Sequence, residues 1–192
     1  AGITPKDIKV KFNGNVLKIN DFKPYVQLYL NEEQKKQTIY ENANERWQYA
    51  VCLNHEYKQV SFVNGIYTSK GGKHIDYILN QIVRKTIDYI VKKKKIKVKP
   101  ATIKEQLMLF VNCVIENPTF GSQTKDFMNL PIKKFGSTCE ISNKFIERIN
   151  KLGVMETALL TNNIKEQNAS KKTDGRKIHT IRGIPKLVDA NY

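Results

Sequence analysis

The residues best suited to bind an anion are six lysines gathered within residues 92–99. Ammonium groups so close together can neutralise nucleic-acid phosphates and release counterions, which gives binding that depends on salt and not on base sequence. They follow a long helical pattern and complement the negative end of its dipole, but their number exceeds what capping needs. A solvated lysine loop is the alternative, and the residues alone leave both open. The six are Lys92, Lys93, Lys94, Lys95, Lys97 and Lys99.

A second candidate is the triplet Gln123, Thr124 and Lys125, which lies in an irregular segment from residue 116 to residue 137. The segment is rich in Asn, Pro, Gly and Thr, and its length indicates a functional loop rather than a simple connection. Taken alone, the triplet is a weak signal, because most lysines in polar loops are only solvated.

Other chemistry has no residues to carry it in this sequence. There is no G-x-G-x-x-G or G-x-x-x-x-G-K-[ST] motif and no nucleophile elbow. His55, His74 and His179 stand apart from any cluster with metal-ligand spacing, so we expect no metal site and give the histidines surface or hydrogen-bonding roles. The three cysteines form no C-x-x-C pair, which predicts buried thiols in a reducing compartment. We therefore expect no complete enzyme within this chain.

The charge balance also favours a polyanionic partner. The 192 residues include 33 lysines and arginines against 18 aspartates and glutamates, a net charge of +15. Nucleic acid is the first candidate and an acidic membrane surface the second, while a basic protein kept soluble by its lysines is the neutral alternative. No apolar run approaches the ~18 residues of a membrane span, and the first residues form no signal peptide. The lack of an initial Met predicts an excised fragment.

The elements that must position these residues begin with a hairpin and a short helix. Residues 9–19 alternate around an Asn13-Gly14 turn, which predicts a β-hairpin. Asp21 is placed to cap a short helix. Residues 31–46 are polar and mixed in charge, which predicts a surface connection.

The middle of the chain predicts two strands, a long helix and a buried strand. Residues 47–53 and 60–64 alternate with period two and are expected to pair through a turn at Asn54-His55. Residues 75–91 keep one apolar stripe at helical spacing. Residues 107–115 are almost all apolar, as in a central strand buried on both faces. The order predicts a βαβ unit in an α+β domain with helices packed over one face of the sheet.

Short helices complete the pattern. Thr102 and the glutamate three residues later have the form of a capping box at the start of a helical turn. Ser142 or Asn143 can cap a helix that Gly153 interrupts, with a second helical stretch to about residue 167. Residues 168–177 are polar and basic and are expected to be flexible.

Six motifs, in the same order along the chain, resemble the transducer domain of eukaryotic-type type IIA DNA topoisomerases. The resemblance covers about residues 8–191. The motifs are SFVNGI (61–66), TSKGGKHIDY (68–77), FVN (110–112), ENPTFGSQTK (116–125), FGSTC (135–139) and IRGIPKLVDAN (181–191).

The resemblance implies a fold and a division of the chain. The fold is a helix-backed mixed β-sheet with a left-handed βαβ crossover, like that of ribosomal proteins, followed by C-terminal helices. Residues 1–140 would form the transducer domain, and residues 141–178 the helices leading toward the DNA gate with a flexible basic segment. Residues 179–192 would begin the connection to the TOPRIM domain. The GHKL nucleotide motifs, the acidic metal site and the nucleophilic tyrosine of the full enzyme are absent from this sequence.

The resemblance also implies roles for both candidate groups. Gln123, Thr124 and Lys125 match the Q-T-K triplet, whose glutamine and lysine reach the ATP γ-phosphate in the neighbouring GHKL module, with Lys125 as the catalytic residue. Lys92, Lys93 and Lys94 best match a basic loop that faces double-stranded DNA, and Lys95, Lys97 and Lys99 extend it. This sequence departs from some relatives by having more lysines there and no glycines after them.

The implied protein is an ATP-hydrolysing isomerase, of which this fragment alone is not expected to be active. ATP and Mg²⁺ would be held mainly by the GHKL module of the same chain, and the full-length enzyme would be a homodimer without a membrane role. The expected location is the nucleus, or the cytoplasm for a large DNA virus. The alternative is a stand-alone nucleic-acid-binding module without a nucleotide role, which would not need the Gln123-Thr124-Lys125 loop.

Overall fold

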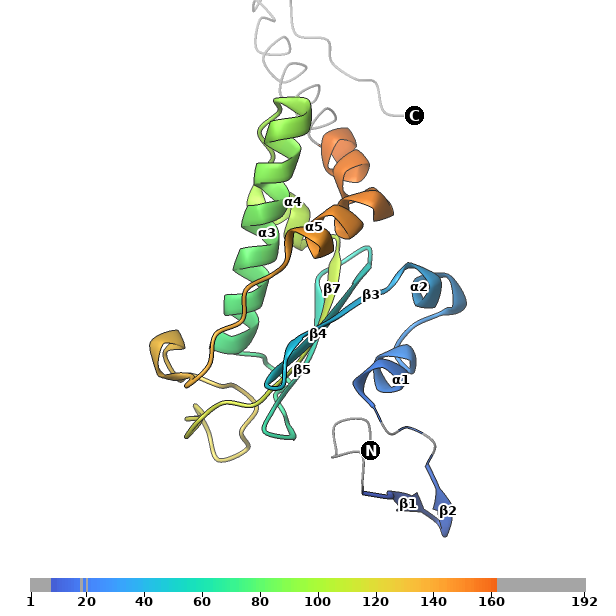
Figure 1. Ribbon diagram of the computed structural model, residues 1–192, viewed down its shortest axis with the longest axis vertical. Coiled ribbons are helices and arrows are strands. Elements are labelled where there is room, and N and C mark those ends of the chain that lie inside the picture. Colours follow the sequence, from blue (N-terminus) through green and yellow to red (C-terminus); the bar gives the residue numbers. More distant parts are fainter. Residues whose placement is uncertain (1–7, 18, 20, 162–192) are drawn as a thin grey trace, which may run out of the picture.

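A five-stranded mixed β-sheet lies at the centre of the protein (Figure 1). The computed structural model describes residues 8–17, 19 and 21–161. The strand order is β3-β4-β7-β5-β6. The strands are β3 (Ile39–Asn44), β4 (Trp47–Leu53), β5 (Lys58–Val63), β6 (Ile66–Tyr67) and β7 (Leu107–Cys113). This observation confirms the predicted α+β class with a mixed sheet.

The predicted pairing of β4 with β5 is wrong, because β7 lies between them. β7 runs antiparallel to β4, with Val51 opposite Leu109, and parallel to β5, with Ser61 opposite Val111. Period-two alternation identifies which residues share a face, but it does not say which strand is the neighbour. β7 is apolar on both faces and therefore takes the central position.

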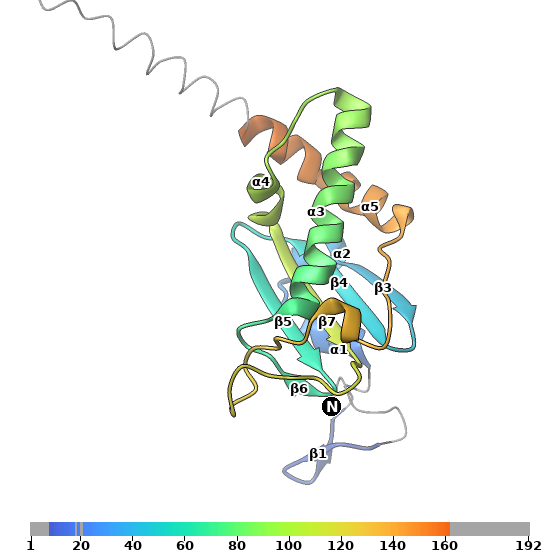
Figure 2. The ribbon, with the colours of Figure 1, turned by 90° about the vertical axis from the view of Figure 1, so that its left-hand side faces the viewer.

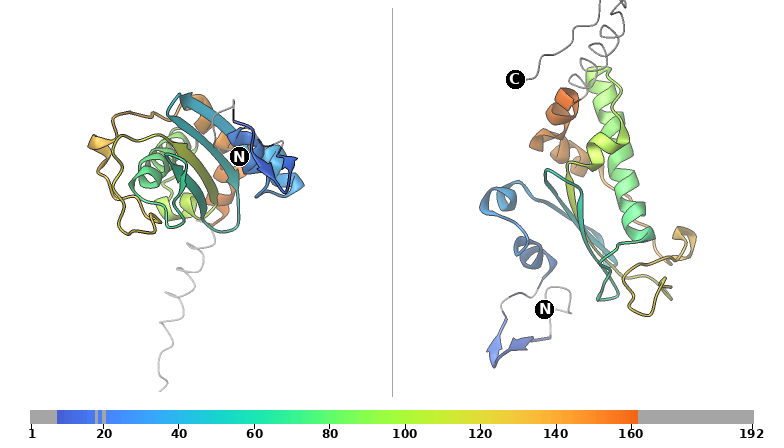
Figure 3. Two further views of the ribbon diagram at one scale, coloured as in Figure 1. Left: turned by 90° about the horizontal axis from the view of Figure 1, so that it is seen from below. Right: turned by 180° about the vertical axis from the view of Figure 1, so that it is seen from behind.

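Helices cover both faces of the sheet, so the predicted packing over one face is wrong (Figures 1 and 3). In β7, Leu109 and Val111 join the larger core beneath α3, whereas Met108 and Phe110 join a smaller core on the other face. The larger core is covered by α3 (Lys73–Lys94), α4 (Pro100–Lys104) and α5 (Asn143–Ile149). The smaller core is covered by α1 (Phe22–Gln27). This helix has only six residues, too few for its apolar spacing to predict which face of the sheet it covers.

The long helix α3 confirms the predicted apolar stripe. Each buried aliphatic side chain contributes about 1.5–3 kcal/mol, so tertiary packing holds this helix in place. It ends at Lys95, which adopts a left-handed conformation and donates its backbone N–H to Val91. In the described part of the chain, none of the helices is long and apolar enough to cross a membrane. The buried residues of α3 are His74, Ile75, Ile78, Leu79, Ile82, Val83, Thr86 and Ile90.

The N-terminal elements confirm the predicted hairpin and helix but not the surface connection. β1 (Lys11–Phe12) and β2 (Asn15–Val16) pair across the Asn13-Gly14 turn, and the Asp21 carboxylate accepts the Phe22 N–H at 2.7 Å. Residues 31–46 instead form α2 (Glu32–Gln37) and the edge strand β3. After Tyr40 this strand continues as Glu-Asn-Ala-Asn, which shows no clear apolar alternation, so its sequence resembles a loop.

The C-terminal elements extend the larger core. Ser142 caps α5 by accepting the Phe145 N–H at 3.1 Å, as expected, and the Phe145 ring meets Tyr49 at 4.9 Å between centroids. A π-helical turn (Asn150–Val154) follows, and helix continues through residue 161. The predicted capping box is wrong: α4 begins at Pro100 with Lys99 as its N-cap, and Thr102 is buried inside it. The predicted segments beyond residue 161 lie outside the described residues.

Candidate functional site

The Gln-Thr-Lys triplet lies at the end of an irregular hairpin, residues 119–129, below the first turn of α3 (Figures 1 and 2). Phe120 and Met128 form an antiparallel bridge, and the Gly121 N–H donates to the Phe127 carbonyl at 2.9 Å. We call residues 119–129 the loop hairpin and residues 122–126 its tip. These contacts give an otherwise irregular segment a defined backbone geometry that supports the tip.

Asp126 organises the tip. Its Oδ1 accepts the Ser122 hydroxyl at 2.7 Å, and its Oδ2 pairs with the Lys70 ammonium at 2.5 Å. The Ser122 and Thr124 hydroxyls lie 2.7 Å apart. The Lys70 and Ser122 hydrogen bonds lower the pKa of Asp126, because both favour the carboxylate. The carboxylate is thus engaged on both oxygens by groups other than Lys125.

All three side chains of the predicted triplet are exposed and share this one tip. Lys125 has a left-handed backbone (φ 57°) and donates its N–H to the Ser122 carbonyl at 3.1 Å. Its ammonium lies 5.9 Å from the centroid of the Phe120 ring. An ammonium over an exposed aromatic ring is held by only about 0.5–1 kcal/mol, so a stronger anionic partner can displace it.

The predicted lysine run lies at the other end of α3, where the chain turns back to α4 (Figure 2). Lys92, Lys93 and Lys94 form the last turn of the helix, and all six lysines of the run are exposed. The Lys93 ammonium sits 4.9 Å from the Tyr89 ring centroid, and contact with Tyr89 raises the pKa of Lys93. Val98, which is 6% exposed, anchors the run to the core. The run is therefore a tethered basic surface.

The two groups do not form one site. α3 has 22 residues and, at about 1.5 Å per residue, separates them by roughly 33 Å. One end of the helix presents an amide and an ammonium on a braced tip, and the other presents a row of ammonium groups. The two ends of α3 therefore carry two separate candidate anion-binding groups.

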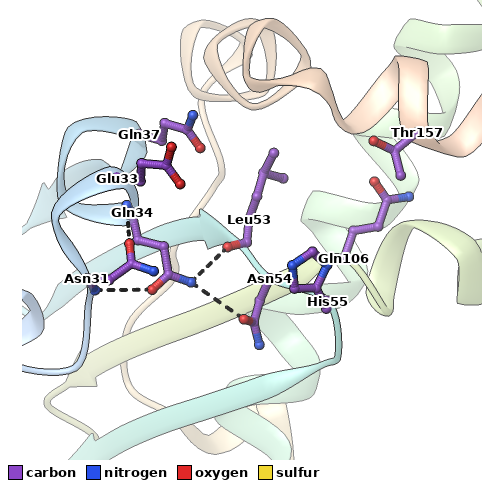
Figure 4. Close-up of a pocket in the computed structure, with 9 residues that line it drawn as sticks. All are labelled: Asn31, Glu33, Gln34, Gln37, Leu53, Asn54, His55, Gln106 and Thr157. Atoms are coloured by element: carbon purple, nitrogen blue, oxygen red, sulfur yellow. Dashed lines mark hydrogen bonds between the residues drawn. The ribbon is translucent and has the colours of Figure 1, made fainter.

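Neither group lines the cavity of about 520 Å³ that opens beside α2 (Figure 4). Its side-chain amides bond mainly to backbone groups: Gln34 Nε2 donates to the Leu53 carbonyl at 3.3 Å, and also reaches the Asn54 Oδ1 at 3.5 Å. The cavity has no basic side chain apart from His55. Its lining residues are Asn31, Glu33, Gln34, Gln37, Leu53, Asn54, His55, Gln106 and Thr157.

The histidines and cysteines fit the roles predicted for them where they are described. His74 is buried with Nε2 3.2 Å from the Thr68 hydroxyl, and burial lowers its pKa to about 4. All three cysteines are buried. Among residues 8–17, 19 and 21–161, no three His, Cys, Asp or Glu side chains gather to hold a metal ion. His179 lies outside these residues.

Sequence patterns missed the residues that brace the triplet. Lys70 and Gly72 belong to the TSKGG stretch before α3, and Asp126 directly follows Lys125. The sequence held one clue, the acidic residue Asp126 directly after the triplet, because an exposed loop has no need of an acid at that position. The partner of that acid lies far away along the chain, so local pattern could not supply it.

Comparison with known proteins places the chain in a family. The family model described as DNA gyrase B matches residues 19–178. The chain is 43% identical over 194 residues to DNA topoisomerase 2 of Drosophila melanogaster, and 44% identical over 200 residues to DNA topoisomerase 2-alpha of Sus scrofa. These matches cover 97% and 100% of this chain, but it spans only 13% of the length of each relative.

Solved structures agree with this assignment. The ATPase region of Saccharomyces cerevisiae topoisomerase II superimposes with a TM-score of 0.75 and 43% identity, covering 82% of this chain and 41% of that one. The ATPase and transducer domains of DNA topoisomerase II from Balamuthia mandrillaris give a TM-score of 0.78 and 34% identity, covering 87% of this chain and 42% of that one. The chain therefore belongs to the DNA gyrase B family, within the ATPase and transducer region of eukaryotic-type type II DNA topoisomerases.

Proposed function

We propose that the chain is the transducer of an ATP-dependent type II DNA topoisomerase, an isomerase, and that it senses the γ-phosphate of ATP held by an adjacent GHKL module. The carrying observation is the exposed ammonium of Lys125 on a braced tip whose own acid, Asp126, is already paired. In the described residues no ion pair includes Lys125, so its charge is open to an anion from outside the chain.

The chemistry of the tip suits a terminal phosphate. A compact ammonium stabilises negative charge on phosphoryl oxygens, and the Gln123 amide can donate to the same oxygens or orient a water molecule. Thr124 supports the tip through its contact with Ser122. ATP with Mg²⁺ supplies the phosphoryl group, and the GHKL module holds most of it.

The same contacts would couple hydrolysis to movement. They exist only while the γ-phosphate is present, so they favour one angle between the nucleotide-binding module and this chain. Loss of the phosphate removes that bias, as in other nucleotide switches. The transducer then relays the change toward the DNA gates during strand passage.

Replacement of Lys125 tests this function in the full-length enzyme. Lys125→Ala is expected to lower kcat for ATP hydrolysis by about 10²–10³-fold, the loss typical of one donor to a developing charge, and to abolish supercoil relaxation. Lys134→Ala, a nearby exposed lysine, is the matched control and should turn over normally. Normal turnover by Lys125→Ala would refute the role.

The lysine run is proposed to contact double-stranded DNA. Its exposed ammonium groups stand at the end of α3 opposite the tip, so DNA and nucleotide would not compete for space. The membership of the chain in an ATPase region favours this combined role over the stand-alone nucleic-acid-binding module.

Several finer expectations belong to the same proposal. Residues 1–140 would act as the transducer, residues 141–178 as helices leading toward the DNA gate, and residues 179–192 as the start of the connection to TOPRIM. α5 packs into the same core as the sheet, so residues 1–140 and 141–178 would differ in function but would fold together. The β5–α3–β7 crossover is proposed to be left-handed, the enzyme a homodimer, and its location the nucleus. An experimental structure of the dimer would test the crossover and the assembly together.

A further inference from the structure

A backbone seat joins the loop hairpin to the beginning of α3. The Met128 N–H donates to the Gly71 carbonyl at 3.1 Å, and the Lys73 N–H donates to the Met128 carbonyl at 2.9 Å. Gly72 lies between these bonds and bridges Met128 in parallel. The hairpin is thereby attached to the beginning of α3 as well as closed by its own bridge between Phe120 and Met128.

Only glycine fits the centre of this seat. Gly72 has φ 140° and ψ −167°, which side chains disfavour, and a Cβ there would lie 2.2 Å from the Met128 carbonyl oxygen. The oxygen is a backbone atom, so it cannot rotate away as a flexible side chain would. A side chain at position 72 must therefore push Met128 away from the beginning of α3.

A second attachment, closer to Lys125 in the sequence, runs through Lys70. The Lys70 N–H donates to the Asp126 carbonyl at 2.9 Å, and the Lys70 ammonium pairs with the Asp126 carboxylate at 2.5 Å. Asp126, directly after Lys125, is thus held twice by Lys70. Met128, two positions further along, is held by Gly71 and Lys73. The Lys70 side chain is 72% exposed, so this pair is separable from the core.

We infer that Gly72 and the Lys70–Asp126 pair are positioning residues, which hold the Lys125 ammonium where a terminal phosphate can meet it. This inference rests on the proposed role of Lys125. Groups fixed to regular elements are placed more accurately than groups on free loops, and a misplacement of about 1 Å can cost about a hundredfold in rate. The seat ties the tip to α3 and so provides that accuracy.

The first experiment replaces the glycine in the full-length enzyme. Gly72→Ala is expected to lower kcat for ATP hydrolysis by about a hundredfold with a smaller change in KM. Gly65→Ala is the matched control: Gly65 also has a positive φ of 79°, but nothing lies within 4 Å of its added Cβ. Wild-type kcat in a folded Gly72→Ala enzyme would overturn the inference.

Charge reversal tests the same inference if Gly72→Ala does not fold. Lys70→Glu and Asp126→Lys should each lower kcat, by up to about fivefold as an exposed ion pair allows, and the double reversal should restore it. Wild-type kcat in both single variants would contradict the inference. So would a double reversal that restores nothing, because the losses in the single variants would then not arise from the Lys70–Asp126 pair.

Lys125→Ala separates this inference from the proposed function. If positioning acts through Lys125, adding Gly72→Ala to Lys125→Ala should lower kcat no further, whereas an unrelated structural defect would add to the loss. Normal turnover by Lys125→Ala would end the proposed role of Lys125 itself. An inactive Lys125→Ala enzyme beside normal pair-reversal variants would end only the positioning role.

Discussion

Acid should destabilise this chain through one buried imidazole, that of His74. The side chain is fully buried, its Nε2 lies 3.2 Å from the Thr68 hydroxyl, and Nδ1 has no partner among the described residues. An Nε2–H tautomer fits this contact and leaves Nδ1 as an unprotonated nitrogen. Adding a proton at Nδ1 would bury a charge with nothing to accept its hydrogen bond.

The magnitude follows from the pKa values in the two states. Burial lowers the pKa of His74 from 6.5 to about 4, so between these values the unfolded chain binds the proton and the folded chain does not. Stability is therefore fully present above about pH 6.5 and is lost as the pH falls toward 4. At about 1.4 kcal/mol per pH unit, the total loss is about 3 kcal/mol, a large share of the ~5–15 kcal/mol typical of a domain.

Denaturant unfolding of the chain at several pH values between 7 and 4.5 measures this effect. His74→Gln is the comparison, because it keeps a hydrogen-bonding side chain and does not titrate, while every other titrating group stays the same. The wild-type chain should lose about 1.4 kcal/mol per pH unit relative to the variant across the window. Parallel stability curves for the two proteins would refute the assignment of a buried neutral imidazole.

The core, the thiols and the basic run each allow a further prediction. Phe145→Ala should lower the free energy of unfolding by about 3–5 kcal/mol in denaturant titrations, whereas exposed Phe12→Ala should change it by less than about 0.5 kcal/mol. The native cysteines should resist iodoacetamide at pH 8 and react after unfolding, since burial raises the pKa of Cys52 to about 11 and of Cys139 to about 12; rapid native labelling would contradict this. In the full-length enzyme, glutamine at all of positions 92–95 should weaken DNA-stimulated ATP hydrolysis and reduce the salt slope of DNA binding, by about 0.9 for each phosphate that the lysines no longer neutralise. An unchanged slope would leave these lysines as solubilising residues.

Elements defined by local pattern were predictable from the sequence. The stripe of α3 repeats over many turns, and Asp21 and Ser142 cap their helices through bonds to residues at most three positions away. The sequence did not predict β3, because this edge strand pairs along one edge only and, of its six residues, only Ile39 is buried. Burial against a partner, and not local propensity, makes that segment a strand.

Non-local arrangement was only partly predictable. A strand apolar on both faces needs covering on both faces, and residues 107–115 were rightly expected to be central. The sequence analysis nevertheless predicts that β4 and β5 pair with each other, because period-two alternation carries no information about which strands are neighbours. The candidate site shows the same limit: Lys125 stood out through resemblance, but its support by Lys70 and Gly72 depends on contacts between distant parts of the chain.

The central place of β7 has a consequence for biosynthesis. The ribosome releases β4 and β5 well before β7, yet those strands meet only through it. Until the nascent chain extends past Cys113, β4 and β5 each lack the neighbouring strand on one edge, a state prone to aggregation. Chains that terminate before this point should therefore be insoluble. Fragments chosen for expression should keep β3 through β7 together.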